Sequence, residues 1–168
     1  AALLALHRVD STDTVDPEGG HWVMPIHGKR TTTRDIKDAH PEHTPLTLAQ
    51  TIGVSSNIGM AKFSERLSLE EQFDMLRDFG FGTPSGIEAS GEASGTLRFP
   101  DPNTSPDYPR VSRAMGYEFS VTAIQLAAAY GAIANNGLLM TPTLIREVRA
   151  PDGTVLYRHR PEAVRQVI

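Results

Sequence analysis

Residues 47–62, TLAQTIGVSSNIGMAK, decide the fold, because a polar triplet there separates two segments with helical apolar spacing. Thr47 and Gln50 form a T-x-x-Q capping box, which satisfies two backbone donors that the start of a helix leaves unpaired. The triplet Ser55-Ser56-Asn57 places a hydroxyl and a carboxamide one residue apart at the helix junction. The pair could relay a proton and hold a peptide, but Ser and Asn also cap helices. Taken alone, the triplet favours capping.

Two more capping boxes predict two more helices. Ser68 and Glu71 open the first, and Thr122 with Gln125 opens the second. The second helix contains the run IQLAAAYGAIA, which is apolar almost all round and therefore predicts burial in the centre of a domain. Residues 135–137, NNG, tolerate left-handed backbone and predict where that helix ends.

The other segments carry weaker patterns. Residues 8–46 are divided by Gly and Pro, and residues 22–24, WVM, are either a short strand or an apolar plug. Residues 86–112 are rich in Gly, Ser, Pro and Asp, which predicts a long surface excursion that touches a ligand or partner. Residues 144–148 and 154–157 flank a PDG turn and predict a hairpin. The sequence therefore predicts a mainly α chain with one hairpin near its C-terminus.

Composition excludes several classes of function. The chain has 168 residues, a formal net charge of −4 and no basic stripe, which argues against nucleic acid and against an electrostatic membrane patch. There is no cysteine, so disulfides and thiolate chemistry are excluded. No apolar run approaches the roughly 18 residues that indicate a membrane span.

Metal and cofactor motifs are also missing from the sequence. His40 and His43 have H-x-x-H spacing, but the prolines at 41 and 45 make a helical ligand pair improbable, and we interpret both as loop histidines. The chain contains no phosphate-binding G-x-x-x-x-G-K-[ST] or G-x-G-x-x-G motif and no G-x-S-x-G elbow. We therefore expect no metal and no cofactor.

Three blocks in order resemble the transpeptidase domain of class B penicillin-binding proteins, which cross-link peptidoglycan in cell division and elongation. The first, residues 38–67, reads DAHPEHTPLTLAQTIGVSSNIGMAKFSERL and contains the triplet. The second, residues 79–97, reads FGFGTPSGIEASGEASGTL, and the third, residues 115–137, reads MGYEFSVTAIQLAAAYGAIANNG. One block would be weak, but three in the family's order are specific.

The resemblance implies a serine acyl-transferase of the β-lactam-binding superfamily. Enzymes of this kind use S-x-x-K, S-x-N and K-[ST]-G elements. Only S-x-N is present here, because Ile26, Arg34 and Gly59 stand three residues before the three lysines, and no lysine begins K-[ST]-G. We therefore expect residues 1–168 to be a partial domain between the two missing elements. Its fold would be the helical portion of the α/β transpeptidase-like domain, with the central sheet missing.

The resemblance also implies roles for single residues. Ser55 would take part in proton transfer between the missing lysine and the leaving nitrogen. Asn57 would hydrogen-bond that lysine and either the peptide group of the substrate or the side-chain amide of a β-lactam. Ser56 would face away and pack. Tyr117 falls where the family places an aromatic wall near the ligand, although a tyrosine beside a turn glycine has an ordinary structural explanation. Glu118 departs from the family's G-Y-G and places a Cβ where glycine permits a tighter turn.

The expected parent protein is a D-Ala-D-Ala transpeptidase that cross-links peptidoglycan stem peptides and is acylated by β-lactams. It would act outside the cytoplasmic membrane, anchored by an N-terminal transmembrane helix, with the division or elongation machinery as partner. The isolated chain is expected to be inactive and to self-associate, because a missing sheet would expose apolar helix faces. Two alternatives stay open: a β-lactam sensor domain, and a non-catalytic scaffold or binding module of the same fold.

Overall fold

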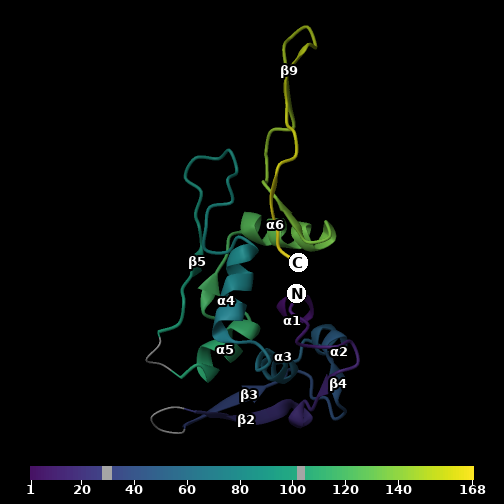
Figure 1. Cartoon of the computed structure of the whole chain (residues 1–168), viewed down its shortest axis with the longest axis vertical. Helices are drawn as coiled ribbons and strands as arrows, with labels where there is room; N and C mark the ends of the chain where they lie inside the picture. The colour runs from purple at the N-terminus through teal and green to yellow at the C-terminus, as the bar shows by residue number, and fades with distance from the viewer. Residues whose placement is uncertain (28–31, 102–104) are drawn as a thin grey trace. The chain divides into compact units, whose positions relative to one another are not determined.

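The computed structural model describes residues 1–27, 32–101 and 105–168, which form two compact units (Figure 1). Unit 1 comprises Ala1–Asp74 and Arg98–Phe119, and unit 2 comprises Met75–Leu97 and Ser120–Ile168. Within both units, helices are combined with two-stranded antiparallel pairings.

Unit 1 contains most of the helices. Its elements in chain order are α1 (Ala2–Ala5), β1 (Thr14–Val15), the 3-10 turn η1 (Glu18–Gly20), β2 (His21–Ile26), β3 (Thr32–Lys37), β4 (Leu46–Thr47), α2 (Leu48–Gly53), α3 (Asn57–Ser64), the first turns of α4 (Leu69–Asp78), and α5 (Asp107–Ala114). Strand β1 pairs with β4, and β2 pairs with β3 over six residues in each strand. Strand β6 (Phe119–Ser120) stands at the boundary between the units.

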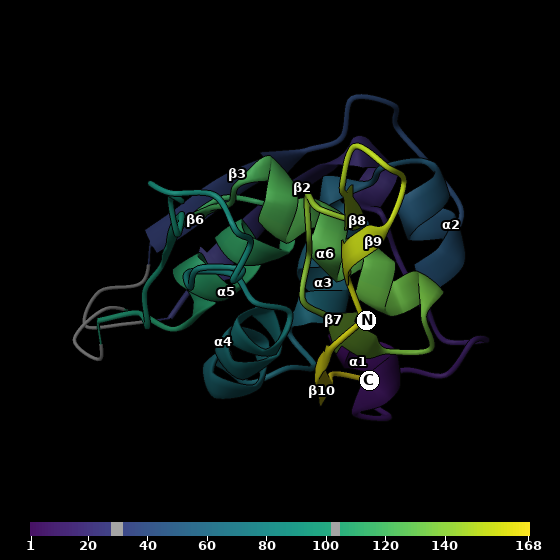
Figure 2. The ribbon, with the colours of Figure 1, turned by 90° about the horizontal axis from the view of Figure 1, so that it is seen from above.

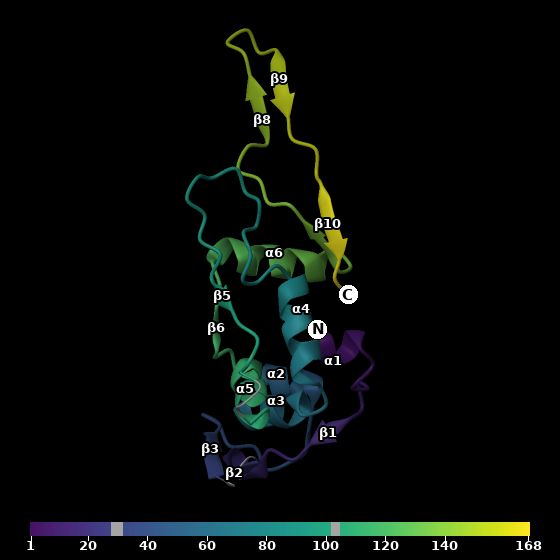
Figure 3. The ribbon, with the colours of Figure 1, turned by 60° about the vertical axis from the view of Figure 1, so that its left-hand side comes forward.

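The β2–β3 pair shows that the expectation of only one hairpin was wrong. Residues 22–24 lie inside β2, so the strand interpretation is confirmed and the plug is not needed. The partner strand, TTRDIK, has too few apolar residues to be recognised alone. Met24 and Ile36 are nevertheless buried, and they join the cluster that packs on α3 and α5. Figures 1 and 3 show the pair along one side of these two helices.

Helix α3 lies at the centre of unit 1 because apolar residues cover it from two directions. Ile58 and Ala61 pack in a cluster with Met24, Ile36 and Val111. Phe63, on another face of the helix, packs in a second cluster with Leu3, Val9, Leu48 and Leu67. The helical apolar spacing predicted for the segment after the triplet is thus confirmed, since these residues form part of the core.

Unit 2 contains one long helix and several short strands. Its elements are the last turn of α4, β5 (Thr96–Leu97), α6 (Ala123–Ala134), β7 (Leu138–Met140), β8 (Glu147–Arg149), β9 (Val155–Arg158) and β10 (Ala163–Gln166). The predicted hairpin is confirmed as the β8–β9 pair, which extends away from α6 in Figure 3. Strand β7 packs on α6 and pairs with β10 (Figure 2), a long-range pairing that no local pattern signalled.

The predicted burial of α6 was wrong. Its start at the Thr122–Gln125 capping box and its end before Asn135 are confirmed. However, Leu126, Tyr130 and Ile133 are 44%, 67% and 50% exposed. The described residues of unit 2 cover one face of this helix, and apolar composition on the other faces cannot bury them without a neighbour.

Gln125 does more than cap α6. Its side chain is 2% exposed, and its Nε2 donates to the carbonyls of Thr83 at 2.7 Å and Ser94 at 2.8 Å. The glutamine therefore holds the Gly-rich second block against the helix within unit 2.

The surface excursion predicted for residues 86–112 is wrong at its C-terminal end. Residues 102–104 lie outside the described residues. Asp107–Ala114 forms α5, in which Val111 and Ser112 are 0% and 1% exposed. The apolar positions are few, so the helix is stabilised mainly by packing on α3 rather than by its own composition.

Candidate active site

The triplet lies at a tight junction between α2 and α3. Helix α2 starts at the predicted Thr47–Gln50 capping box and ends at Gly53. Ser55 then adopts left-handed backbone, with φ of 57°, and Ser56 is the N-cap of α3. A non-glycine residue costs about 1–2 kcal/mol in the left-handed region, so the surrounding contacts must hold this turn in place.

Ser56 supplies those contacts together with Asp38. The Ser56 hydroxyl donates to Asp38 Oδ2 at 2.6 Å and accepts from the Gly59 amide at 2.9 Å. Asp38 Oδ1 accepts from the Ile58 amide at 3.0 Å. The carboxylate thus binds the first turn of α3, where a helix favours negative charge. The prediction that Ser56 faces inward is confirmed, since it is 1% exposed.

The same turn exposes Ser55 and Asn57 on either side of the buried serine. The Asn57 amide nitrogen donates to the Lys37 carbonyl at 3.0 Å, which fixes the side chain and leaves its oxygen and one N–H unused by the described residues. The Ser55 hydroxyl makes no hydrogen bond to any described residue. The junction therefore presents a hydroxyl and an oriented carboxamide to solvent.

Helices α2 and α3 pack closely at Gly59, and this contact fixes the turn between them. A Cβ at Gly59 would lie 2.6 Å from Thr51 Cγ2 and 2.7 Å from Thr51 Oγ1. Only glycine lets the first turn of α3 approach α2 this closely. Thr51 is itself fully buried, so it cannot move aside.

Lys62, the lysine nearest to the triplet in sequence, is engaged elsewhere in unit 1. Its ammonium forms an ion pair with Glu18 and lies 5.2 Å from the centroid of the Trp22 ring. These contacts bind α3 to η1 and β2. Lys62 therefore has a structural role in the described fold.

Tyr117 follows the C-terminus of α5. The Gly116 amide donates to the Arg113 carbonyl and the Tyr117 amide to the Ser112 carbonyl, both at 2.9 Å. Gly116 and Glu118 have φ of 90° and 68°. Glu118, which stands where the family has glycine, thus adopts a left-handed backbone conformation that favours glycine.

The Tyr117 side chain is 63% exposed. Among the described residues no hydrogen bond or ring contact joins it to Ser55 or Asn57. The triplet is thus an assembled group within unit 1, and the part of Tyr117 in the site stays a prediction.

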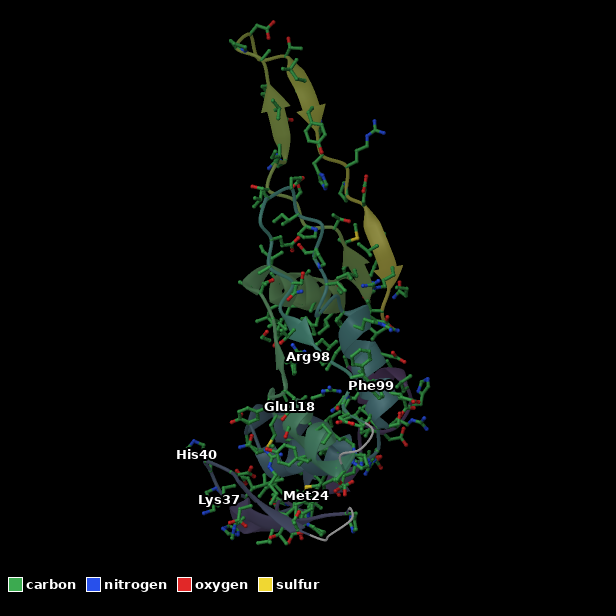
Figure 4. The ribbon with its side chains drawn as sticks, turned by 90° about the vertical axis from the view of Figure 1, so that its left-hand side faces the viewer. Met24, Lys37, His40, Arg98, Phe99 and Glu118 are labelled. Carbon is green, nitrogen blue, oxygen red and sulfur yellow. The ribbon has the colours of Figure 1, made fainter. Side chains whose placement is uncertain are left out.

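Neither histidine at 40 or 43 belongs to a metal site in the part of the chain that is described. No group of three or more His, Asp or Glu side chains there could hold an ion. Figure 4 places His40 near Lys37, at the edge of unit 1. In the same described part, no helix is both long and apolar enough to cross a membrane.

Comparison with known proteins places the chain in a family. Residues 4–168 match the penicillin-binding protein transpeptidase domain. The chain therefore belongs to the penicillin-binding protein transpeptidase domain family. It is 35% identical to the penicillin-binding protein PbpB of Mycolicibacterium smegmatis over 73% of this chain and 19% of that protein. It is 30% identical to the peptidoglycan D,D-transpeptidase MrdA of Haemophilus influenzae over 87% of this chain and 22% of the relative.

A solved structure agrees with these relatives. The apo transpeptidase domain of penicillin-binding protein 3 from Burkholderia pseudomallei superposes with a TM-score of 0.79 at 30% identity. The match covers 99% of this chain and 44% of that one. The chain thus spans about a fifth of the length of the two relatives and less than half of the solved domain.

Asp38 is the functional-site residue whose role sequence reasoning missed. It appeared only as the first letter of the first family-like block. An acidic residue 18 positions before a serine carries no local signal for a hydrogen bond. Its place directly after β3 could have raised the question, since Asp is a preferred partner for helix N-terminal amides.

Proposed function

We propose that this chain supplies the S-x-N element of a serine-type D,D-transpeptidase that cross-links peptidoglycan and is acylated by β-lactams. The observation that carries the proposal is the junction at residues 55–57. Two exposed polar side chains there flank a buried serine that Asp38 fixes. Capping alone explains Ser56, but it does not explain why its neighbours present unused hydrogen-bonding groups.

Ser55 would act in proton transfer. A hydroxyl both donates and accepts, so Ser55 Oγ could pass a proton from a lysine of the S-x-x-K element to the nitrogen that leaves the tetrahedral intermediate. Asn57 would position the acyl donor, because its free carbonyl oxygen and N–H can pair with both edges of a peptide group. Tyr117 would form an aromatic wall for the substrate.

The remaining elements of the proposal concern the larger assembly. Residues 1–168 would be the part of the domain between S-x-x-K and K-[ST]-G, mainly helical and without the central sheet. The substrate would be a stem peptide ending in D-Ala-D-Ala, outside the cytoplasmic membrane. Division or elongation proteins would be partners of an enzyme anchored by a transmembrane helix.

Fluorescent penicillin followed by denaturing electrophoresis tests the proposal. The isolated 168-residue chain should form no covalent band, because it has no S-x-x-K nucleophile; a band would contradict the partial-site interpretation. The gene's complete product should be labelled. In the complete product, Ser55→Ala or Asn57→Ala should lower the rate of acylation by about 10²-fold or more. Ser11→Ala, an exposed serine in the same unit, is the matched control.

Two other functions stay open under the same experiment. A β-lactam sensor would be acylated but would not cross-link stem peptides in a transpeptidation assay. A scaffold or binding module would not be labelled even as the complete product. The name D,D-transpeptidase carried by the MrdA relative supports the enzyme over both.

A further inference from the structure

Unit 1 contains a cavity of about 450 Å³ that the proposed acyl-transfer chemistry does not use. Its walls come from residues 98–101, from the first turn of α5 and from the segment after α5. Arg98, Phe99 and Glu118 all line it, and Figure 4 shows these three labelled side chains gathered in one region of the unit. The volume falls within the usual range for small-ligand sites, about 300–1,000 Å³.

Arg98 and Arg113 bring positive charge to the wall of this cavity. Arg113, which lines it, is 6% exposed, and its Nε and Nη1 atoms make no hydrogen bond. Its Nη2 donates to the Arg98 carbonyl, a neutral group. No carboxylate of the described residues forms an ion pair with Arg98 or Arg113. Glu118 acts on Arg113 electrostatically without a direct ion pair. The buried N–H groups of Arg113 that make no hydrogen bond are nevertheless unfavourable.

A third guanidinium lies against the wall of the cavity. The Arg34 guanidinium stacks 4.5 Å from the centroid of the Tyr108 ring, and Tyr108 lines the cavity. Arg34 Nη1 also donates to the Ser112 hydroxyl at 2.6 Å. Among the described side chains, Arg34 likewise has no carboxylate within ion-pair distance. Three cations therefore act on one small volume.

Carboxylates around the cavity offset part of this charge. Asp107, at the start of α5, is paired with Arg110 at 2.8 Å and with the His27 ring at 3.0 Å. Asp101 lines the cavity but already interacts with another residue. Asp101 and Glu118 both line the cavity and oppose Arg98 and Arg113, so the surplus of positive charge comes from Arg34.

From this geometry we infer that the cavity binds the free carboxylate of a peptide or N-acyl amino acid. The exposed Arg98 would meet the carboxylate directly, and the shielded Arg113 would attract it across a low-dielectric gap. Phe99 and Tyr108 are 48% and 46% exposed and offer apolar surface to the body of the ligand. A single negative charge suits the site better than a phosphate dianion, which Glu118 would repel more strongly.

An NMR titration of the 168-residue chain with N-acetyl-phenylalanine tests this inference. N-acetyl-phenylalaninamide is the matched neutral probe. We expect saturable binding of the acid and at least tenfold weaker binding of the amide. Arg98→Gln should weaken binding of the acid about tenfold and leave the amide unchanged. Arg160→Gln removes an exposed arginine of unit 2 and is the control variant.

Equal binding of acid and amide, or equal effects of Arg98→Gln and Arg160→Gln, would overturn the inference, as would no saturable binding of the acid. A stem tetrapeptide with free carboxylates provides a second arm. Tighter binding than that of N-acetyl-phenylalanine supports a cell-wall peptide as the source, and similar binding supports peptide carboxylates in general. The titration involves no acylation, so its failure leaves the proposed transpeptidase function untouched, and the reverse also holds.

Discussion

Replacing Ser56 by alanine tests the account of the triplet more directly than any other change. The variant loses the 2.6 Å hydrogen bond to Asp38 and the 2.9 Å bond from the Gly59 amide. Loss of an N-cap costs about 1 kcal/mol, and a hydrogen bond to a charged group contributes about 1.5–3 kcal/mol. Because the two bonds share one hydroxyl, we expect a total of about 2–3 kcal/mol rather than their sum.

Ser55→Ala is the matched control one residue away. Its hydroxyl is exposed and has no partner among the described residues, so the variant should stay within about 0.5 kcal/mol of the parent. Urea unfolding followed by the fluorescence of Trp22 reports on unit 1, since this single tryptophan packs against the core cluster there.

A double-mutant cycle with Asp38→Asn should give a coupling of about 1 kcal/mol or more. Equal destabilisation by the two alanine variants, or no coupling, would refute the account. If the account holds, substitutions of Ser56 change the free energy of unfolding, and substitutions of Ser55 change the rate of acylation.

Three further predictions concern other parts of the chain. Gly59→Ala should destabilise unit 1 by about 1–3 kcal/mol in thermal unfolding, since its Cβ would overlap the buried Thr51; Gly53→Ala, with open space around it, should not, and similar losses would contradict the packing argument. Burial opposes ionisation of Asp107, but hydrogen bonds from His27 outweigh it and lower its pKa below 3.8. The ionised Asp107 therefore contributes fully to the free energy of unfolding above the ordinary pKa of an aspartate, and this contribution is lost as the pH falls through the lower pKa of the folded state. The loss of stability caused by Asp107→Asn should accordingly become smaller in acid. A loss of stability that does not change with pH would contradict the pairing. Replacing both Tyr130 and Ile133 of α6 by serine should reduce self-association of the chain, measured by light scattering, because both side chains are exposed. If the unsubstituted chain is itself monomeric, this expectation is wrong.

The capping boxes show what local sequence can determine. Each depends on two side chains three residues apart, so both partners of its hydrogen bonds can be recognised in the local sequence. All three are present, at Thr47, Ser68 and Thr122. The inward orientation of Ser56 and the end of α6 at residues 135–137 follow from equally local rules.

Elements whose stability depends on distant partners escaped prediction for the opposite reason. Strand β3 and helix α5 have weak patterns of their own and are stabilised by packing on α3. Strand β10 pairs with β7 across more than twenty intervening residues. The exposure of α6 depends on which neighbours cover it, and the composition of the helix does not indicate which those are.

The sequence by itself determined the helix junction, the triplet and the family-like order of the blocks, because these depend on side chains near one another in the chain. Only the tertiary structure decided that Asp38 fixes Ser56, that Ser55 and Asn57 are exposed together, and that arginines gather around one cavity. Those facts arise where β3, α3 and α5 meet. Hydrogen bonds and charges between residues tens of positions apart depend on packing, and no spacing in the sequence encodes them.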